Sequence, residues 1–125
     1  MNYLKMAKAL FTSAPSLPPG DCFERIRSGA AVLIDVREPD EWASGVAEHA
    51  VRLALSDLSD ARKDWKPFLA ANAQRELLVY CAAGGRSAIA ARLLVQEGFR
   101  AANTGGLRDW VAAGWPVVNG PATSR

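Results

Sequence analysis

Two short runs of apolar residues constrain the fold of this chain more than any other feature. Residues 31–36 read Ala-Val-Leu-Ile-Asp-Val, and residues 77–80 read Leu-Leu-Val-Tyr. Because neither run alternates with polar residues, each predicts a short strand buried on both faces, as in a parallel sheet. A weaker third strand is expected over residues 99–103.

The segment between the second and third predicted strands indicates how they are joined. Residues 87–97 are good helix formers with a broad apolar face, and a glycine follows them. A strand, a helix and a strand at this spacing predict a parallel βαβ unit. Further helices are expected over 107–113 and over 57–71, the latter broken at Pro67. We therefore predict an α/β fold with a central, mostly parallel sheet flanked by helices.

The chain has 125 residues, a length that favours one folded domain. We place this domain at residues 15–120. Residues 1–14 are expected to form an N-terminal arm or short helix, and residues 121–125 a C-terminal tail. Prolines exclude regular helix over residues 15–20, and a short helix is expected over residues 21–27.

Composition narrows the classes of function. The formal charge is only +2 and the arginines are scattered, which argues against a nucleic-acid partner. No apolar stretch is long enough to span a membrane, and the N-terminus lacks the features of a secretory signal, so a cytoplasmic protein is expected. With one histidine and two cysteines far apart in the sequence, neither a metal site nor a cofactor is expected.

The candidate site begins where the second apolar run ends, at Cys81. In open α/β sheets, ligands bind at the carboxyl ends of the strands. A glycine-containing turn into a helix places unpaired backbone N–H groups around one point, which makes an anion-binding nest. Such a nest and the guanidinium of Arg86 favour the thiolate, so the pKa of Cys81 should fall and the sulfur become nucleophilic.

The residues expected to form this nest, and so to bind the substrate, follow Cys81 directly: Ala82, Ala83, Gly84, Gly85, Arg86 and Ser87. The alternative for Cys81 is a buried cysteine that only packs as a small apolar side chain. The combination of strand, cysteine, glycine turn, arginine and helix favours the nucleophile. Cys22 lies far from this motif, and we interpret it as a structural or surface thiol.

Three separated blocks resemble the rhodanese family, and together they cover the chain from about Leu17 to Val118. They are DVREPDEWASG at residues 35–45, CAAGGRS at 81–87 and TGGLRDWVAAGWPV at 104–117. The resemblance implies a single rhodanese-like α/β domain. It also implies a sulfurtransferase in which Cys81 takes sulfane sulfur from a small donor such as thiosulfate. The resulting persulfide passes this sulfur to cyanide or a thiol.

Other functions stay open. One is a sulfur-delivery or redox-regulatory module that serves a thioredoxin-like or other protein acceptor. A phosphatase or arsenate reductase of the same fold is less favoured. Related phosphatases resemble Cys-x5-Arg, whereas Cys81 to Arg86 is one residue shorter, which suits sulfur better than a tetrahedral phosphate.

The first block offers supporting residues. Asp35 and Arg37 are expected to brace the loops at the strand ends by ion pairing and backbone hydrogen bonds, although Arg37 facing the site is the alternative. The family usually continues with a segment resembling Gly-His-Ile-Pro-Gly-Ala. Here Val46 occupies the histidine position, and His49 is interpreted as an exposed residue and not as a catalytic base.

Overall fold

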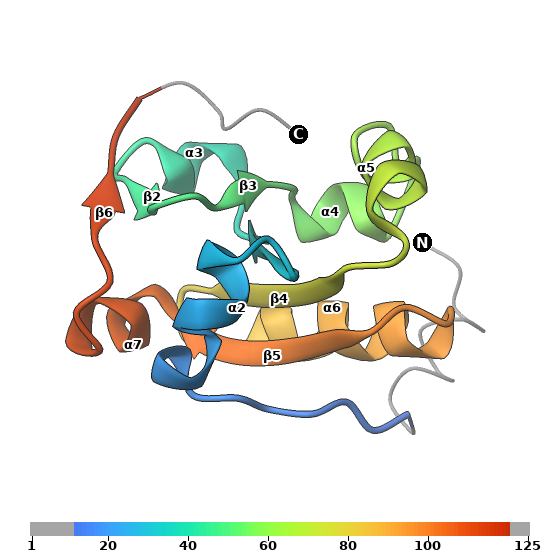
Figure 1. The fold of residues 1–125 in the computed structure, drawn as a ribbon. Coiled ribbons are helices and arrows are strands. Elements are labelled where there is room, and N and C mark those ends of the chain that lie inside the picture. Colours follow the sequence, from blue (N-terminus) through green and yellow to red (C-terminus); the bar gives the residue numbers. More distant parts are fainter. Residues whose placement is uncertain (1–11, 121–125) are drawn as a thin grey trace.

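The computed structural model describes residues 12–120 as an α/β domain around a four-stranded parallel sheet (Figure 1). The strand order is β3-β1-β4-β5, and each neighbouring pair in this order is parallel. A separate antiparallel pair joins β2 to β6. The predicted class, a mostly parallel sheet flanked by helices, is confirmed. The strands are β1 Ala31–Asp35, β2 Val46–Ala47, β3 Val51–Arg52, β4 Glu76–Cys81, β5 Ala101–Gly106 and β6 Val117–Val118.

Both faces of the sheet are covered, as the unbroken apolar runs require. Alternate residues of β1 belong to different packing clusters: Val32 and Ile34 to one, Ala31 and Leu33 to the other. The first cluster includes residues of α4, α5 and α6, and the second includes residues of η1 and α7. The helices are η1 Pro19–Cys22, α2 Phe23–Arg27, α3 Pro39–Trp42, α4 Leu55–Leu58, α5 Trp65–Asn72, α6 Gly85–Gln96 and α7 Leu107–Ala112.

The helix predicted over residues 57–71 is two helices, so the expectation of a break at Pro67 is wrong. The chain leaves helix between α4 and α5, and Pro67 lies in the first turn of α5, where a missing N–H is tolerated. Asp57 makes the break, because its carboxylate accepts the backbone N–H groups of Lys63, Asp64 and Trp65 at 2.8, 2.9 and 3.0 Å.

Smaller differences concern element ends. The third predicted strand, expected over 99–103, is β5, which begins at Ala101 and runs to Gly106. Helix α6 begins at Gly85, two residues before the predicted start. Asp21 makes no side-chain cap, and a 3₁₀ turn over Pro19–Cys22 precedes α2. The short pair β2–β6 was not predicted, since two-residue strands carry no periodicity.

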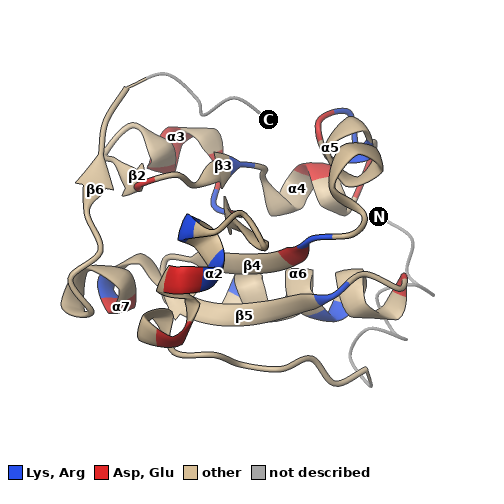
Figure 2. Ribbon diagram, in the orientation of Figure 1, with Lys and Arg blue, Asp and Glu red and all other residues tan. Residues whose placement is uncertain are grey.

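The edge of β5 is covered by an extended segment that precedes η1. The backbone N–H of Leu17 donates to the carbonyl of Asn103, and the N–H of Asn103 donates to the carbonyl of Pro15, both at 2.9 Å. Most of the predicted arm and the whole predicted tail lie outside the described residues. Among residues 12–120, no helix is long and apolar enough to cross a bilayer. Figure 2 shows acidic and basic residues interspersed along the ribbon, with α2 carrying both.

Candidate functional site

The candidate nucleophile lies at the junction of β4 and α6. Strand β4 ends at Cys81, the chain turns, and α6 begins at Gly85. Gly84 closes the turn with φ of 102°, a left-handed conformation that favours glycine. In this conformation its backbone N–H donates to Sγ of Cys81 at 3.0 Å. The predicted order of strand, cysteine, glycine turn and helix is present, and the turn aims an amide at the sulfur.

The environment of the Cys81 sulfur favours the thiolate. Burial alone would raise the pKa of Cys81. Hydrogen bonds from the side chain and backbone of Ser87 and from the amides of Ala83 and Gly84 outweigh burial, and the pKa is lowered. The hydroxyl of Ser87 lies 3.3 Å from Sγ, on the first turn of α6. Donors from the turn and from the first turn of α6 therefore surround the sulfur.

Arg86 lies at the start of α6, and its guanidinium is paired with a carboxylate. It donates to both oxygens of Glu41, at 2.6 and 2.9 Å. This pair, helped by the backbone N–H of Glu38, lowers the pKa of Glu41 to about 2. From the sequence, Arg86 was expected to be a cation available to an anion, and no role was predicted for Glu41. Glu41 belongs to the first motif block, but no spacing rule reveals which arginine it meets.

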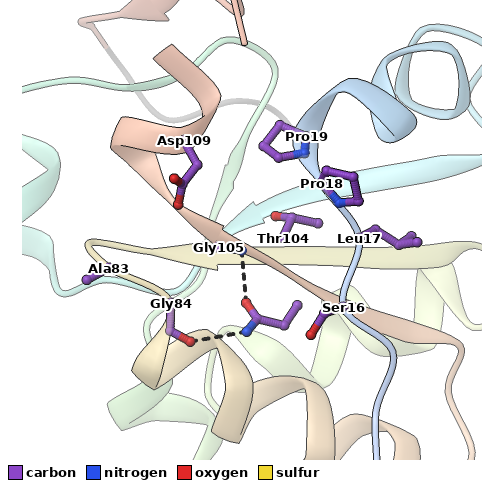
Figure 3. A pocket seen from close by; sticks show the side chains of 10 residues that line it. Ser16, Leu17, Pro18, Pro19, Ala83, Gly84, Thr104, Gly105 and Asp109 are labelled. Carbon is purple, nitrogen blue, oxygen red and sulfur yellow. Dashed lines mark hydrogen bonds between the residues drawn. The ribbon is translucent and has the colours of Figure 1, made fainter. Parts of the chain in front are cut away.

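Asn103, on β5, holds the loop by hydrogen bonds and was not predicted from the sequence. Its Oδ1 lies 2.7 Å from the hydroxyl of Ser87 and accepts the N–H of Gly105 at 3.1 Å. Its Nδ2 donates to the carbonyl of Gly84 at 3.2 Å, and the dashed lines of Figure 3 mark the bonds at Gly84 and Gly105. One amide thus ties the turn, α6 and the end of β5 together.

The glycines of the third motif block let β5 approach the loop closely. A Cβ on Gly106 would lie 2.2 Å from the carbonyl oxygen of Ala82, so no larger residue fits without a shift. A Cβ on Gly84 would lie 3.5 Å from Cα of Gly105, within ordinary contact. Close packing of backbone on backbone thus requires glycine at 106, whereas Gly105 has φ of 88° and its Cβ would lie 2.7 Å from Oδ2 of Asp109.

Asp35, at the end of β1, and Arg37, two residues later, form a buried ion pair. Nη2 of Arg37 lies 2.8 Å from Oδ2 of Asp35, and the two side chains are 6% and 0% exposed. Arg37 also donates to the carbonyl of Gly45 at 2.7 Å, and the hydroxyl of Tyr80 donates to Asp35 at 2.6 Å. Tyr80 and Cys81 belong to opposite packing clusters, so Asp35 and Arg37 meet the face of the sheet away from the sulfur. Their geometry is that of a brace.

A cavity of about 510 Å³ flanks the cysteine loop on the side of β5 (Figure 3). Its lining is uncharged except for Asp109, whose Oδ2 accepts the N–H of Gly106 at 2.8 Å. Ala83 belongs to both the loop and the cavity wall, so a molecule in this cavity would touch the loop. The lining residues are Ser16, Leu17, Pro18, Pro19, Ala83, Gly84, Asn103, Thr104, Gly105 and Asp109.

Three other residues that could carry chemistry, Cys22, His49 and Trp65, have no contact with Cys81 among the hydrogen bonds and ring contacts of the described residues. Cys22 is fully buried in η1 and, like Cys81, forms no disulfide. His49 is exposed and lies with its ring edge toward Trp115. Trp65 is buried and donates to the carbonyl of Ala54 at 2.8 Å, so it packs the core. Among residues 12–120, no three His, Cys, Asp or Glu side chains are grouped as metal ligands.

Comparison with known proteins identifies the class that this fold and loop define. The model of the rhodanese-like domain matches residues 19–113, and the chain belongs to that family. A sulfurtransferase of Allochromatium vinosum is 32% identical over 93 residues, which cover 70% of this chain and 78% of the relative.

Solved structures agree on the fold. A rhodanese-related protein of Thermoplasma volcanium is 33% identical with a TM-score of 0.69, covering 83% of this chain and 97% of that one. A protein of unknown function from Rhodopseudomonas palustris, named as a possible tyrosine phosphatase, is 26% identical with a TM-score of 0.70 and 91% coverage of both chains.

Proposed function

We propose that this protein is a sulfurtransferase whose nucleophile is Cys81 and whose sulfur donor is a small sulfane compound such as thiosulfate. The observation that carries the proposal is the hydrogen bonding around the sulfur: the N–H of Gly84 donates to it at 3.0 Å, the hydroxyl of Ser87 lies 3.3 Å from it, and the pKa of Cys81 is lowered. Membership of the rhodanese-like family and the likeness to a named sulfurtransferase support the reaction class.

The reaction follows from a stabilised thiolate. The Cys81 thiolate attacks the outer sulfur of thiosulfate, the new S–S bond forms as the old one breaks, and sulfite leaves with the bonding electron pair. The persulfide anion left on Cys81 has its charge on the terminal sulfur, which the backbone N–H groups of the same turn would stabilise. Cyanide or a thiolate then takes that sulfur and restores the thiolate.

A second candidate is delivery of sulfur to a larger thiol, including a thioredoxin-like protein. Ala82 and Ala83 are exposed, and the cavity beside Ala83 could receive part of such an acceptor.

Because both cysteines are free, we also propose a cytoplasmic location, where thiols stay reduced.

A phosphatase reading is favoured only by the likeness to the Rhodopseudomonas palustris protein. Against it, the loop from Cys81 to Arg86 is one residue shorter than the Cys-x5-Arg pattern of related phosphatases, and the guanidinium of Arg86 is already paired with Glu41. Hydrolysis of an aryl phosphate that depends on Cys81 would revive this reading.

The test is thiocyanate formation from thiosulfate and cyanide, with Cys81→Ala and Cys22→Ala as a matched pair. We expect activity in the wild type and in Cys22→Ala and none in Cys81→Ala. Mass spectrometry of the donor-treated protein should find one extra sulfur atom on the Cys81 peptide alone. Full activity in Cys81→Ala, or no transfer by the wild type to cyanide, to small thiols or to a protein thiol, would refute the proposal.

A further inference from the structure

We propose that Glu41 determines donor specificity by competing with anionic donors for Arg86. The inference rests on the proposed function and names the kind of donor that the site disfavours. Arg86 is the cation of the cysteine loop, five residues after the sulfur-bearing Cys81. The guanidinium interacts electrostatically with Cys81, so a doubly charged donor at this sulfur is attracted to a guanidinium that a carboxylate already holds.

The geometry makes Glu41 a fixed competitor. Its two oxygens accept the two terminal nitrogens of Arg86 at 2.6 and 2.9 Å, the paired arrangement that suits guanidinium and carboxylate. Oε1 of Glu41, the oxygen that lies 2.6 Å from Arg86, also accepts the backbone N–H of Glu38 at 3.0 Å, within the capping box that starts α3. Glu41 is thus held by its own helix as well as by Arg86.

The pair is also reachable from solvent. The side chains of Arg86 and Glu41 are 37% and 29% exposed, so an incoming anion can compete for the guanidinium. The pKa of Glu41 is about 2, and the carboxylate therefore stays charged at any pH at which the protein is assayed. Glu41 therefore competes for Arg86 at every assay pH, and the loss of this guanidinium as a partner costs a dianionic donor more than a monoanionic one.

A second bidentate pair in the chain provides a matched control. Arg62 donates to both oxygens of Glu97 at 2.5 and 2.7 Å, and the two side chains are 21% and 17% exposed. Glu97 follows the last residue of α6, whereas Arg86 is in its first turn. The two pairs are separated by most of this helix, about 16 Å along its axis.

The experiment compares donors of different charge on Glu41→Gln, which keeps an oxygen for Arg86 but removes the charge. Thiosulfate carries two charges and methanethiosulfonate carries one, and attack by Cys81 releases sulfite from the first and methanesulfinate from the second. We expect the KM for thiosulfate to fall about fivefold or more, the KM for methanethiosulfonate to change less than twofold, and kcat to stay within twofold. Glu97→Gln should leave both donors unchanged.

Reciprocal variants separate competition from positioning. If Glu41 acts through Arg86, Glu41→Gln should bring no gain for thiosulfate in an Arg86→Met background. An unchanged or higher KM for thiosulfate in Glu41→Gln, or an equal change for both donors, would overturn the proposal and leave Glu41 as a positioning residue.

A binding measurement keeps this inference distinct from the proposed function. In a Cys81→Ser background no transfer occurs, and titration calorimetry measures thiosulfate affinity alone. Adding Glu41→Gln to that background should tighten binding about fivefold or more. If no enzyme variant turns over but Glu41→Gln tightens binding, the proposed reaction is refuted and the competition for Arg86 stands. If turnover occurs but binding is not tighter, the competition is refuted and the proposed reaction stands.

Discussion

Cys81 and Cys22 have the same side chain and nearly the same burial, yet the pKa values of their thiols are shifted in opposite directions. They are 1% and 0% exposed, and both are free. The pKa of Cys22 is raised to about 11, mainly by burial, whereas the pKa of Cys81 is lowered although burial acts against it. Burial by itself therefore does not decide whether a thiol becomes nucleophilic.

The two sulfurs also face different hydrogen-bonding groups. Sγ of Cys22 lies 3.6 Å from the carbonyl oxygen of Pro18, an acceptor that suits the protonated thiol. Sγ of Cys81 lies 3.0 Å from the N–H of Gly84, a donor that suits the thiolate. Burial keeps the proton on Cys22, whereas hydrogen-bond donors outweigh burial at Cys81 and favour loss of its proton.

The largest effect is expected from Gly106→Ala. The added Cβ would meet the carbonyl oxygen of Ala82 at 2.2 Å, so the loop must move and its amides leave the sulfur. Because misplacement by about 1 Å can cost a hundredfold in rate, we expect thiocyanate formation to fall about 100-fold. The pKa of Cys81 should rise toward that of Cys22.

Gly20→Ala is the control for this change, since a Cβ at Gly20 meets nothing within 4 Å. It should keep full activity and an unchanged titration of Cys81. Gly106→Ala with normal transfer would show that close packing of β5 on the loop is not what activates the sulfur.

The two thiols should also differ in alkylation. At pH 7.5 a thiol with an ordinary pKa of about 8.5 is roughly 300 times more ionised than one at 11. The thiolate with the lower pKa is intrinsically the weaker nucleophile, and this offsets roughly tenfold of the difference in ionisation. We expect iodoacetamide to modify Cys81 about 20-fold faster than Cys22 or more, measured by peptide mass spectrometry.

The pH dependence of labelling should show that the pKa values of the two thiols are shifted in opposite directions. Labelling of Cys81 should level off below the pH expected of an ordinary thiol, whereas labelling of Cys22 should still rise at pH 10 because its pKa is about 11. Equal rates with parallel pH profiles would remove the contrast between the two sites.

Ser87→Ala should give a smaller effect on the same sulfur. It removes a hydroxyl 3.3 Å from Sγ and leaves the amide of Gly84 in place. The pKa of Cys81 should rise, and transfer at neutral pH should fall about tenfold, the value of roughly 1.5 kcal/mol for a hydrogen bond to a charged group. Raising the pH should recover the rate. As a control, Ser28→Ala at an exposed position should leave both the transfer rate and the pKa of Cys81 unchanged. A loss that high pH does not recover would assign Ser87 to loop structure alone.

The smallest effect is expected from Cys22→Ala. Transfer should stay within twofold of wild type, because this thiol takes no part in the proposed site. Removing a buried sulfur should lower the free energy of unfolding by about 1 kcal/mol, measured by urea denaturation. A loss of transfer as large as that of Cys81→Ala would make Cys22 part of the reaction.

Local patterns were enough to predict much of this fold. The apolar runs that became β1 and β4 and the helical segment that became α6 are each set by residues adjacent in the chain. Placement of Cys81 at a strand end followed from the same patterns. The break between α4 and α5 was misplaced because Asp57 caps amides six to eight residues away, beyond the reach of helix periodicity.

What the sequence determined by itself is the βαβ unit and the position of Cys81 at the turn within it. Tertiary structure alone decided the partners of that turn. Glu41 meets Arg86 across 45 residues of chain, and Asn103 supports Gly84 across 19. Which polar group faces a buried sulfur or a loop arginine depends on how separate strands are brought side by side, and no local spacing encodes that.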